Sequence, residues 1–277
     1  MGLKKINKIV CFGTSFTAGG GYYFNSKDME EEKYYHEYYN SLNEFPKTMF
    51  NYSYPGQLKK LFNNNVQIEN LGKCGYGNDR TSRLIFDLVE NEVDLSQYLF
   101  LIEFAYMGRE ELYSNTLNSY VVHNYHINDD LSYDRGTLAK NHKYDTDSEN
   151  MLLNELSKII VSYNKNFWNY ENEHTKNVRN IIFLVNYLIR NNVNFLVVEG
   201  IHNNLMDYLI KNNNLLEFSP HLLDGDKYSM NHYIEDNKLK ISDVTNGIIE
   251  DYHASLEGNK LIASKIHEHL LNFYRFE

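Results

Sequence analysis

The sequence predicts an α/β fold in which helices cover both faces of a parallel β-sheet. Four short apolar runs rich in β-branched and aromatic residues alternate with segments of helical periodicity. Apolar runs bounded by turn residues are typical of buried strands in such a sheet. Because strand and helix alternate, right-handed crossovers place helices on both faces. The expected architecture is therefore a three-layer α/β/α sandwich.

The individual elements follow from hydrophobic spacing. The predicted strands lie at residues 8–13 (KIVCFG), 66–72 (VQIENLG), 98–105 (YLFLIEFA) and 193–200 (VNFLVVEG). Elsewhere, apolar residues recur three and four positions apart, which is the spacing of an amphipathic helix. The predicted helices lie at residues 54–65, 79–92 and 177–192 and in the segment after Ser255. Serine is a favoured N-cap, so Ser255 marks the start of the last helix.

The length favours one domain. The chain has 277 residues, of which 42% are hydrophobic, and this is enough for a single large core. Two long polar segments, residues 22–50 and 113–150, interrupt the alternation; both contain many tyrosines. Long loops of this kind are usually functional or poorly ordered. We interpret both as insertions at the carboxyl edge of the sheet in a single domain spanning 1–277. Their tyrosines either stack on a sugar or pack on one another.

The charge and the N-terminal sequence limit the partners and the location. With 27 Lys and Arg against 37 Asp and Glu, the formal charge is −10, which disfavours binding to nucleic acid or to an anionic membrane. The apolar stretch near the N-terminus is too short for a signal peptide or a membrane span. The two cysteines, Cys11 and Cys74, make no disulfide framework. We therefore expect a cytoplasmic protein that acts on a small molecule.

Three short blocks contain residues suited to nucleophilic catalysis. The first strand leads into "GTSFTAGGG", which places Ser15 at its carboxyl end. Serine is a poor nucleophile unless a base takes its proton and an oxyanion site receives the charge. The glycine-rich "GKCGYGN" follows the second strand, and "EDYHASLEG" places His253 before the last helix. A lone serine at a strand end usually satisfies backbone groups, so the combination of blocks carries the hypothesis.

Together, these blocks resemble those of the SGNH (GDSL-type) hydrolases. In that family the nucleophilic serine lies in a turn after the first strand, matched here by Gly13, Thr14 and Ser15. A glycine of the second block gives a backbone N–H to the oxyanion, and Gly75, or else Gly77, matches it. The resemblance implies a flavodoxin-like sheet of about five parallel strands.

The last block of the family, an acid and a histidine before the final helix, resembles the segment around His253. The acid orients the imidazole and stabilises its charged form. Asp251 lies two residues before His253, and Glu250 lies three residues before it, which is the more usual spacing in the family. A shorter carboxylate is the tighter orienter, which favours Asp251, and Glu250 stays the alternative.

The third block departs from the family pattern. The family has Gly-x-Asn-Asp after the third strand, with the asparagine as an oxyanion donor, whereas this chain reads "LIEFAYMGREE". Loss of one such donor typically costs about 10²–10³ in turnover. Asn78 of the second block is one candidate replacement, and Arg109 is a candidate for orienting or neutralising the site.

No metal or cofactor is expected. His123 and His126 have a spacing that suits a metal, but no further ligands accompany them. The segment from Asp224 lacks the glycine and glutamate of a calcium loop. The glycines around Ser15 match neither a P-loop nor a dinucleotide fingerprint.

These expectations combine into a function. The resemblance implies a serine esterase that removes an acyl group from a small ester, such as an O-acetylated carbohydrate, through Ser15, His253 and Asp251. An O-acyltransferase would use the same residues with another acceptor. A non-catalytic binding or structural module with this fold is a third reading, favoured by the missing asparagine, because fold alone does not fix function.

Overall fold

The computed structural model describes residues 3–20, 47–73, 76–92, 94–104, 109–115, 119–124, 158, 162, 169–200, 230 and 253–276. Its centre is a parallel sheet of four strands in the order β3-β2-β4-β7. The strands are β2 (Lys8–Phe12), β3 (Gln67–Asn70), β4 (Tyr98–Phe104) and β7 (Asn194–Glu199). All four apolar runs of the sequence are therefore confirmed as strands, in the described part of a sheet for which about five strands were expected.

The side chains of β2 alternate between two cores. Ile9 and Cys11 belong to one buried cluster, and Val10 and Phe12 belong to the other. Successive side chains of a strand point to opposite faces, so a strand covered on both faces is apolar throughout. Burial of this kind raises the pKa of the Cys11 thiol well above its usual value, which keeps it a packing residue.

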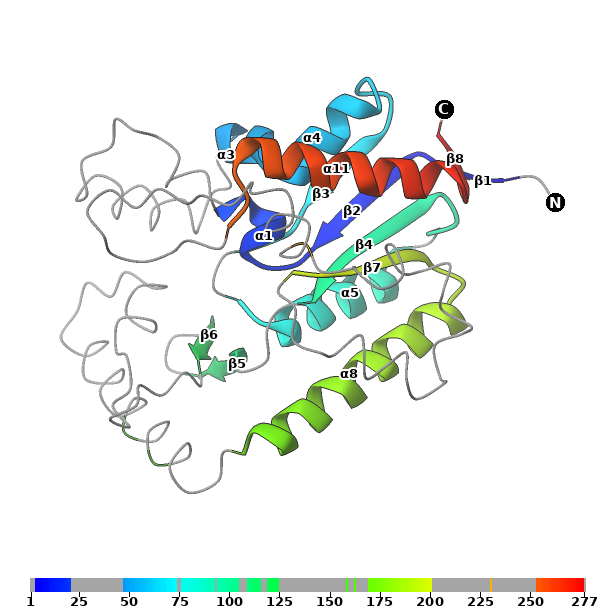
Figure 1. The fold of residues 1–277 in the computed structure, drawn as a ribbon. Helices are drawn as coiled ribbons and strands as arrows, with labels where there is room; N and C mark the ends of the chain where they lie inside the picture. The colour runs from blue at the N-terminus through cyan, green and yellow to red at the C-terminus, as the bar shows by residue number, and fades with distance from the viewer. Residues whose placement is uncertain are drawn as a thin grey trace, which may run out of the picture.

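Helices cover both faces, as predicted (Figure 1). On one face lie α4 (Tyr54–Leu61) and α11 (Leu256–Leu271), which pack on each other. On the other lie α5 (Asn78–Asn91) and α8 (Tyr170–Arg190). The three-layer α/β/α sandwich is confirmed.

Local capping explains where the helices begin. The Ser255 side chain accepts a hydrogen bond from the backbone N–H of Gly258 at 3.1 Å, which confirms the predicted start of α11. Ser53 caps α4 in the same way. Asn169 accepts bonds from Glu171 N and Asn172 N, so α8 begins several residues before the predicted helix. These caps satisfy N–H groups that a helix end otherwise leaves unpaired.

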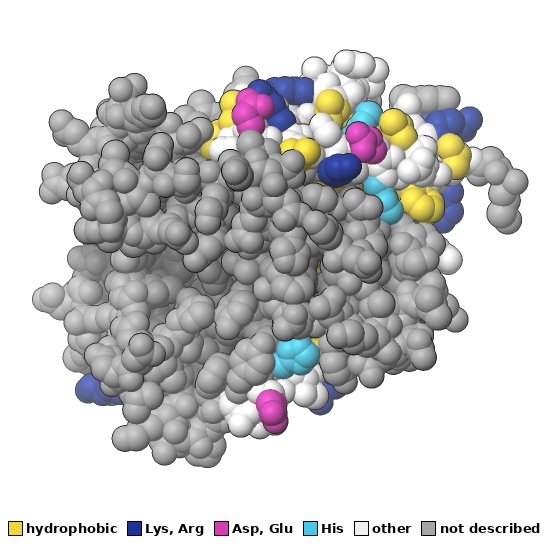
Figure 2. Space-filling model, in the orientation of Figure 1, with side chains coloured by type: hydrophobic (Ala, Val, Ile, Leu, Met, Phe, Trp, Pro, Cys, Tyr) yellow, Lys and Arg dark blue, Asp and Glu magenta, His cyan; other side chains and the backbone are white. Residues whose placement is uncertain are grey.

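The outer side of α11 is a mixed, solvated surface (Figure 2). Lys260 pairs with Glu257 and Lys265 with Glu268, each three residues apart. Exposed pairs of this kind contribute only about 0.2–1 kcal/mol each. Within the described segments, no helix has both the length and the apolarity that a bilayer crossing requires.

Among the described residues, two strand pairs lie outside the main sheet. β1 (Lys4–Ile6) pairs in parallel with β8 (Tyr274–Phe276), which joins the two ends of the described chain. β5 (Arg109–Ser114) pairs antiparallel with β6 (Ser119–Asn124). The second hairpin strand falls inside the predicted 113–150 insertion, where the sequence showed no period.

The rest of that insertion, residues 125–150, and residues 21–46 of the other lie outside the described residues. Residues 47–50 of the 22–50 segment open α3 (Lys47–Tyr52). The single domain with two insertions stays a prediction.

Strand order places the functional edge. The chain passes from β2 outward to β3 and then returns to the other side of β2 to form β4. In open α/β sheets, ligands bind at the carboxyl ends of the strands where the order reverses in this way. The residues that follow β2 and end β4 therefore lie at the expected position of a site.

Candidate active site

The Ser15 turn begins at the carboxyl end of β2. Gly13 has φ +156°, Thr14 is the N-cap of the short helix α1 (Ser15–Ala18), and Gly19 ends that helix with a left-handed φ of +82°. Glycine adopts such positive φ values without the strain that a Cβ causes. The two glycines thus permit a sharp turn that leaves Ser15 half-buried at its start.

His253 lies beside Ser15 at Gly20. A Cβ placed on Gly20 would lie 3.1 Å from Ser15 Cβ and 3.1 Å from His253 Nε2. These two atoms are therefore no farther apart than twice that distance. The ring of Phe16 also packs against the His253 ring, with centroids 5.4 Å apart and a tilt of 39°. The fold thus brings together two residues that are widely separated in the sequence.

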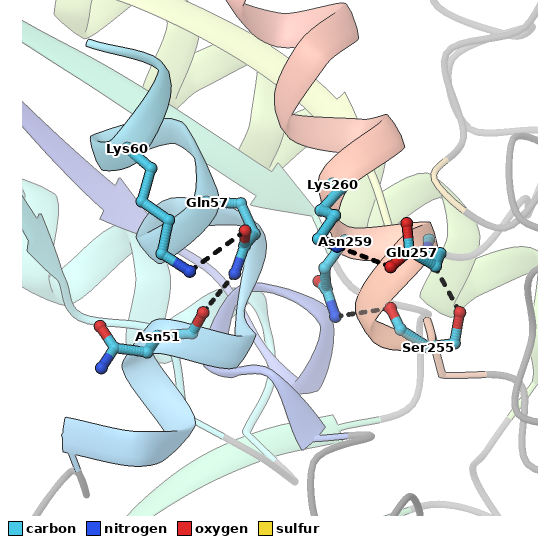
Figure 3. A network of polar contacts seen from close by, with 8 residues as sticks. Asn51, Gln57, Lys60, Ser255, Glu257, Asn259 and Lys260 are labelled. Carbon is cyan, nitrogen blue, oxygen red and sulfur yellow. Dashed lines mark hydrogen bonds and ion pairs between the residues drawn. The ribbon is translucent and has the colours of Figure 1, made fainter. Parts of the chain in front are cut away.

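The loop after His253 is fixed by hydrogen bonds. The carbonyl oxygen of Ala254 accepts from Tyr52 Oη at 3.1 Å and from Asn259 Nδ2 at 3.3 Å. Asn259, only 2% exposed, also donates to the carbonyl of Ser255 at 3.1 Å. Figure 3 shows Asn259 and Ser255 at the first turn of α11, with Gln57 of α4 on the neighbouring helix. His253 therefore precedes a firmly anchored helix start.

The Ser15 turn contacts a buried carboxylate. Glu103, near the end of β4, has no exposed surface and accepts hydrogen bonds from Thr14 and Thr17. The Thr17 hydroxyl also lies 3.1 Å from Tyr54 Oη. A buried carboxylate is costly unless it is hydrogen-bonded, and these contacts supply its donors.

The second block lies against the same turn. Lys73 N donates to the carbonyl oxygen of Gly13 at 3.1 Å, and Asn70 Nδ2 donates to that of Thr17 at 2.8 Å. A Cβ on Gly72 would meet the Thr17 side chain at 2.7 Å. The segment that leads to the predicted oxyanion glycine, residue 75, is therefore packed directly against the Ser15 turn.

The other predicted site residues are placed as follows. Asn78 begins α5, is 7% exposed, and donates from Nδ2 to Asn177 Oδ1 of α8 at 3.4 Å. Arg109 is the first residue of β5, and its side chain lies outside the described part. Three further predicted residues lie outside the described residues, namely Gly75, Glu250 and Asp251.

The histidines and the acidic segment that were considered as metal ligands form no metal site among the described residues. His123 belongs to β6, whereas His126 and the segment from Asp224 lie outside the described residues. Among the described residues, no three His, Cys, Asp or Glu side chains gather as metal ligands.

An ionic cluster links α5 to β5. Arg83 donates from Nε and Nη2 to the two carboxylate oxygens of Glu111, both at 3.1 Å, which is a bidentate pair. Burial raises the pKa of Glu111, against the lowering effect of Arg83. Burial also raises the pKa of the Asp79 carboxyl, and the charge of Lys176 partly offsets this. Part of the charged third block therefore supports the packing of α5.

Two residues of the site were not identified from the sequence, Gly20 and Glu103. Glu103 left a signal, because it is the only charged residue in the apolar run YLFLIEFA, and a charge in a buried strand needs partners. Gly20 stands in a cluster of three glycines, and nothing in the sequence separates it from Gly19 and Gly21.

No protein-family model and no curated protein matches the sequence. Similar solved structures include one described as a lipolytic protein of the G-D-S-L family from Desulfitobacterium hafniense DCB-2. It has 12% sequence identity and a TM-score of 0.43, over 95% of this chain and 99% of that chain. A similar protein from Veillonella parvula DSM 2008, of the same family, has 12% identity and a TM-score of 0.40, over 94% and 96% of the two chains.

A family two carbohydrate esterase from Clostridium thermocellum, solved in complex with cellohexaose, is also similar. It has 14% identity and a TM-score of 0.43, over 98% of this chain and 65% of that chain. The strand order and the two helical layers of the present chain establish its α/β/α fold. The similar structures include members of the family whose motifs the sequence resembles.

Proposed function

We propose that this protein is a serine esterase in which Ser15 is the nucleophile and His253 is the general base. The observation that carries the proposal is the approach of Ser15 and His253 across Gly20, at the carboxyl edge of the sheet. Of the His253 imidazole atoms, Nε2 lies closest to the position that a Cβ on Gly20 would occupy. A nucleophilic serine needs a base within reach of its hydroxyl, and the position of His253 beside Gly20 supports it in that role.

The reaction would proceed in two steps. Ser15 Oγ attacks the carbonyl carbon of the ester while His253 Nε2 takes the hydroxyl proton. The tetrahedral oxyanion collapses to an acyl-enzyme, and His253 returns the proton to the departing alcohol. Water then attacks the acyl group with His253 again as base, which releases the acid and restores Ser15.

Other residues have supporting roles in this proposal. The backbone N–H groups of Ser15 and Gly75 donate to the oxyanion, and Asn78 or Arg109 replaces the asparagine missing from the third block. Asp251, or Glu250 in its place, orients His253. These assignments rest on the motif resemblance of the sequence. The substrate class that the resemblance implies is a small ester, such as an O-acylated carbohydrate; an acyltransferase would transfer the same acyl group to an acceptor hydroxyl.

One observation favours a binding module without turnover. The third block has no asparagine, and the side chain of Asn78 already donates to Asn177. If the oxyanion has too few donors, Ser15 and His253 form a site that holds a ligand without cleaving it. The two functions differ in whether Ser15 is activated.

The experiment is labelling with a fluorophosphonate, followed by intact-mass analysis and peptide mapping. We expect one adduct, on Ser15, that is lost in the Ser15→Ala and His253→Ala variants. Ser96→Ala, before β4, and His267→Gln, on α11, are the matched controls and should label as the wild type does. An unlabelled but folded wild-type protein would rule out the esterase and leave the binding module. An adduct on Ser15 that persists in the His253→Ala variant would show that His253 is not the base.

A further inference from the structure

Glu103 holds both sides of the turn that carries Ser15. Its Oε2 accepts hydrogen bonds from the backbone N–H of Thr14 at 3.0 Å and of Thr17 at 2.8 Å, and from the Thr17 hydroxyl. Its Oε1 accepts from the Thr14 hydroxyl at 2.6 Å. One carboxylate thus bridges the residue before Ser15 and the second residue after it.

Two glycines leave room for this carboxylate. A Cβ on Gly13, which directly follows β2, would collide with Glu103 and with the side chain of Thr17. A Cβ on Gly200, directly after β7, would collide with Glu103 Oε1. The carboxylate therefore occupies a closed space between the carboxyl ends of three neighbouring strands, and its side chain is fully buried.

We propose that Glu103 is a positioning residue for the reaction of Ser15. This inference rests on the proposed esterase function and adds to it a residue that does not touch the substrate. The carboxylate fixes the backbone on both sides of Ser15, and with it the directions of the Ser15 side chain and backbone N–H. Displacement of a reacting group by about 1 Å can cost about 10² in rate, so a small shift of the turn has a large effect.

Two variants of Glu103 distinguish a role of the carboxylate's position from a role of its charge. Glu103→Gln keeps the length and one acceptor oxygen, and its NH₂ can face the Thr14 hydroxyl, which then accepts instead of donating. Glu103→Asp keeps the charge but is shorter, so the carboxylate is drawn back from the turn. A positioning role predicts that the Gln variant is the more active, and a charge role predicts the reverse.

The measurement is the rate constant for fluorophosphonate labelling of Ser15, with kcat and KM on a small ester. We expect Glu103→Gln within about 10-fold of the wild-type rate constant and Glu103→Asp slower by about 100-fold. In the Asp variant kcat should fall while KM changes less than about three-fold. Glu111→Gln, whose carboxylate contacts Arg83 instead of this turn, is the control and should label normally.

Different experimental outcomes would contradict the positioning role of Glu103 and the esterase proposal. If the wild type labels but Glu103→Asp labels equally fast, or Glu103→Gln is the slower, the inference is wrong and the esterase stands. If the wild type does not label, the esterase is wrong, and amide hydrogen exchange tests the turn. Exchange at Thr14 and Thr17 should then be faster in the Asp than in the Gln variant; equal exchange overturns the inference.

Thr14→Val covers the case in which Glu103→Asp does not fold. Valine keeps the shape of threonine and removes only the hydroxyl that donates to Oε1. Labelling of Ser15 should slow by about 3- to 10-fold, which corresponds to one hydrogen bond. An unchanged rate in the folded Thr14→Val protein would also overturn the inference.

Discussion

The hydroxyl of Tyr52 donates a hydrogen bond of 3.1 Å to the carbonyl oxygen of Ala254, the residue that follows His253. Tyr52 ends α3 and is only 7% exposed, so this bond is shielded from water. It connects the helix before α4 to the loop before α11. The position of the proposed base thus depends on a contact between segments that are 202 residues apart in the sequence.

Tyr52→Phe should weaken this anchor. A buried hydrogen bond contributes about 0.5–1.5 kcal/mol, and we expect the free energy of unfolding to fall by that amount in urea titrations. Labelling of Ser15 should slow as well, because the loop of His253 loses a contact. Tyr187→Phe removes a hydroxyl that donates to Glu90 on the protein surface, and it should leave labelling unchanged. Normal labelling of a destabilised Tyr52→Phe protein would show that this hydrogen bond stabilises the fold but does not position His253.

Gly20→Ala should disturb the approach of Ser15 and His253. The added Cβ would lie 3.1 Å from Ser15 Cβ and from His253 Nε2, closer than ordinary van der Waals contact. We expect the variant to fold. Labelling of Ser15 should fall by about 10-fold or more, because Gly20 lies between the two reacting side chains. Circular dichroism checks the fold, and the labelling rate checks the site. A folded Gly20→Ala protein that labels at the wild-type rate would contradict the close approach of Ser15 and His253 at Gly20.

Ser255→Ala should destabilise the start of α11. The Ser255 hydroxyl accepts from Gly258 N at 3.1 Å, and loss of a serine N-cap typically costs about 0.5–2 kcal/mol. The midpoint of urea unfolding should fall with an unchanged slope. Ser255→Asp is the matched variant, since aspartate caps as well as serine does, and it should restore the midpoint. Equal midpoints for all three proteins would show that the cap contributes nothing.

Asp79→Asn should change how stability depends on pH. Burial raises the pKa of Asp79 above its ordinary value of 3.8, so the folded state holds this proton more tightly than the unfolded state does. A carboxyl of this kind makes the protein less stable as the pH rises from its unfolded-state pKa to its higher folded-state pKa. As the pH rises above that ordinary value, the loss of stability should be smaller in the variant than in the wild type.

Most titrating groups are common to both proteins, so the difference between the two urea-midpoint profiles reports the Asp79 carboxyl together with its charge effect on Glu111, Glu173 and Lys176. Asp87→Asn lies on the same helix with its side chain 64% exposed, and its profile should follow the wild type. Parallel profiles for Asp79→Asn and the wild type would contradict the effect of burial.

Much of the sheet could be predicted from the sequence because its signals are local. A strand covered on both faces must be apolar throughout, so the run YLFLIEFA could be identified as β4 without its neighbours. Ser255 marked the start of α11 because a cap acts on N–H groups within its own turn. The β5–β6 hairpin could not be predicted, since the segment around residues 119–124 has no period that marks a strand.

The site divides in the same way. The sequence by itself determined that Ser15 follows the first strand of the sheet and that His253 precedes the last helix. Only the tertiary structure decided that these residues meet across Gly20 and that Glu103 holds the Ser15 turn. The physical reason is the strand order: β4 lies next to β2 through a crossover. Contacts between residues that a crossover brings together leave no periodicity in the sequence.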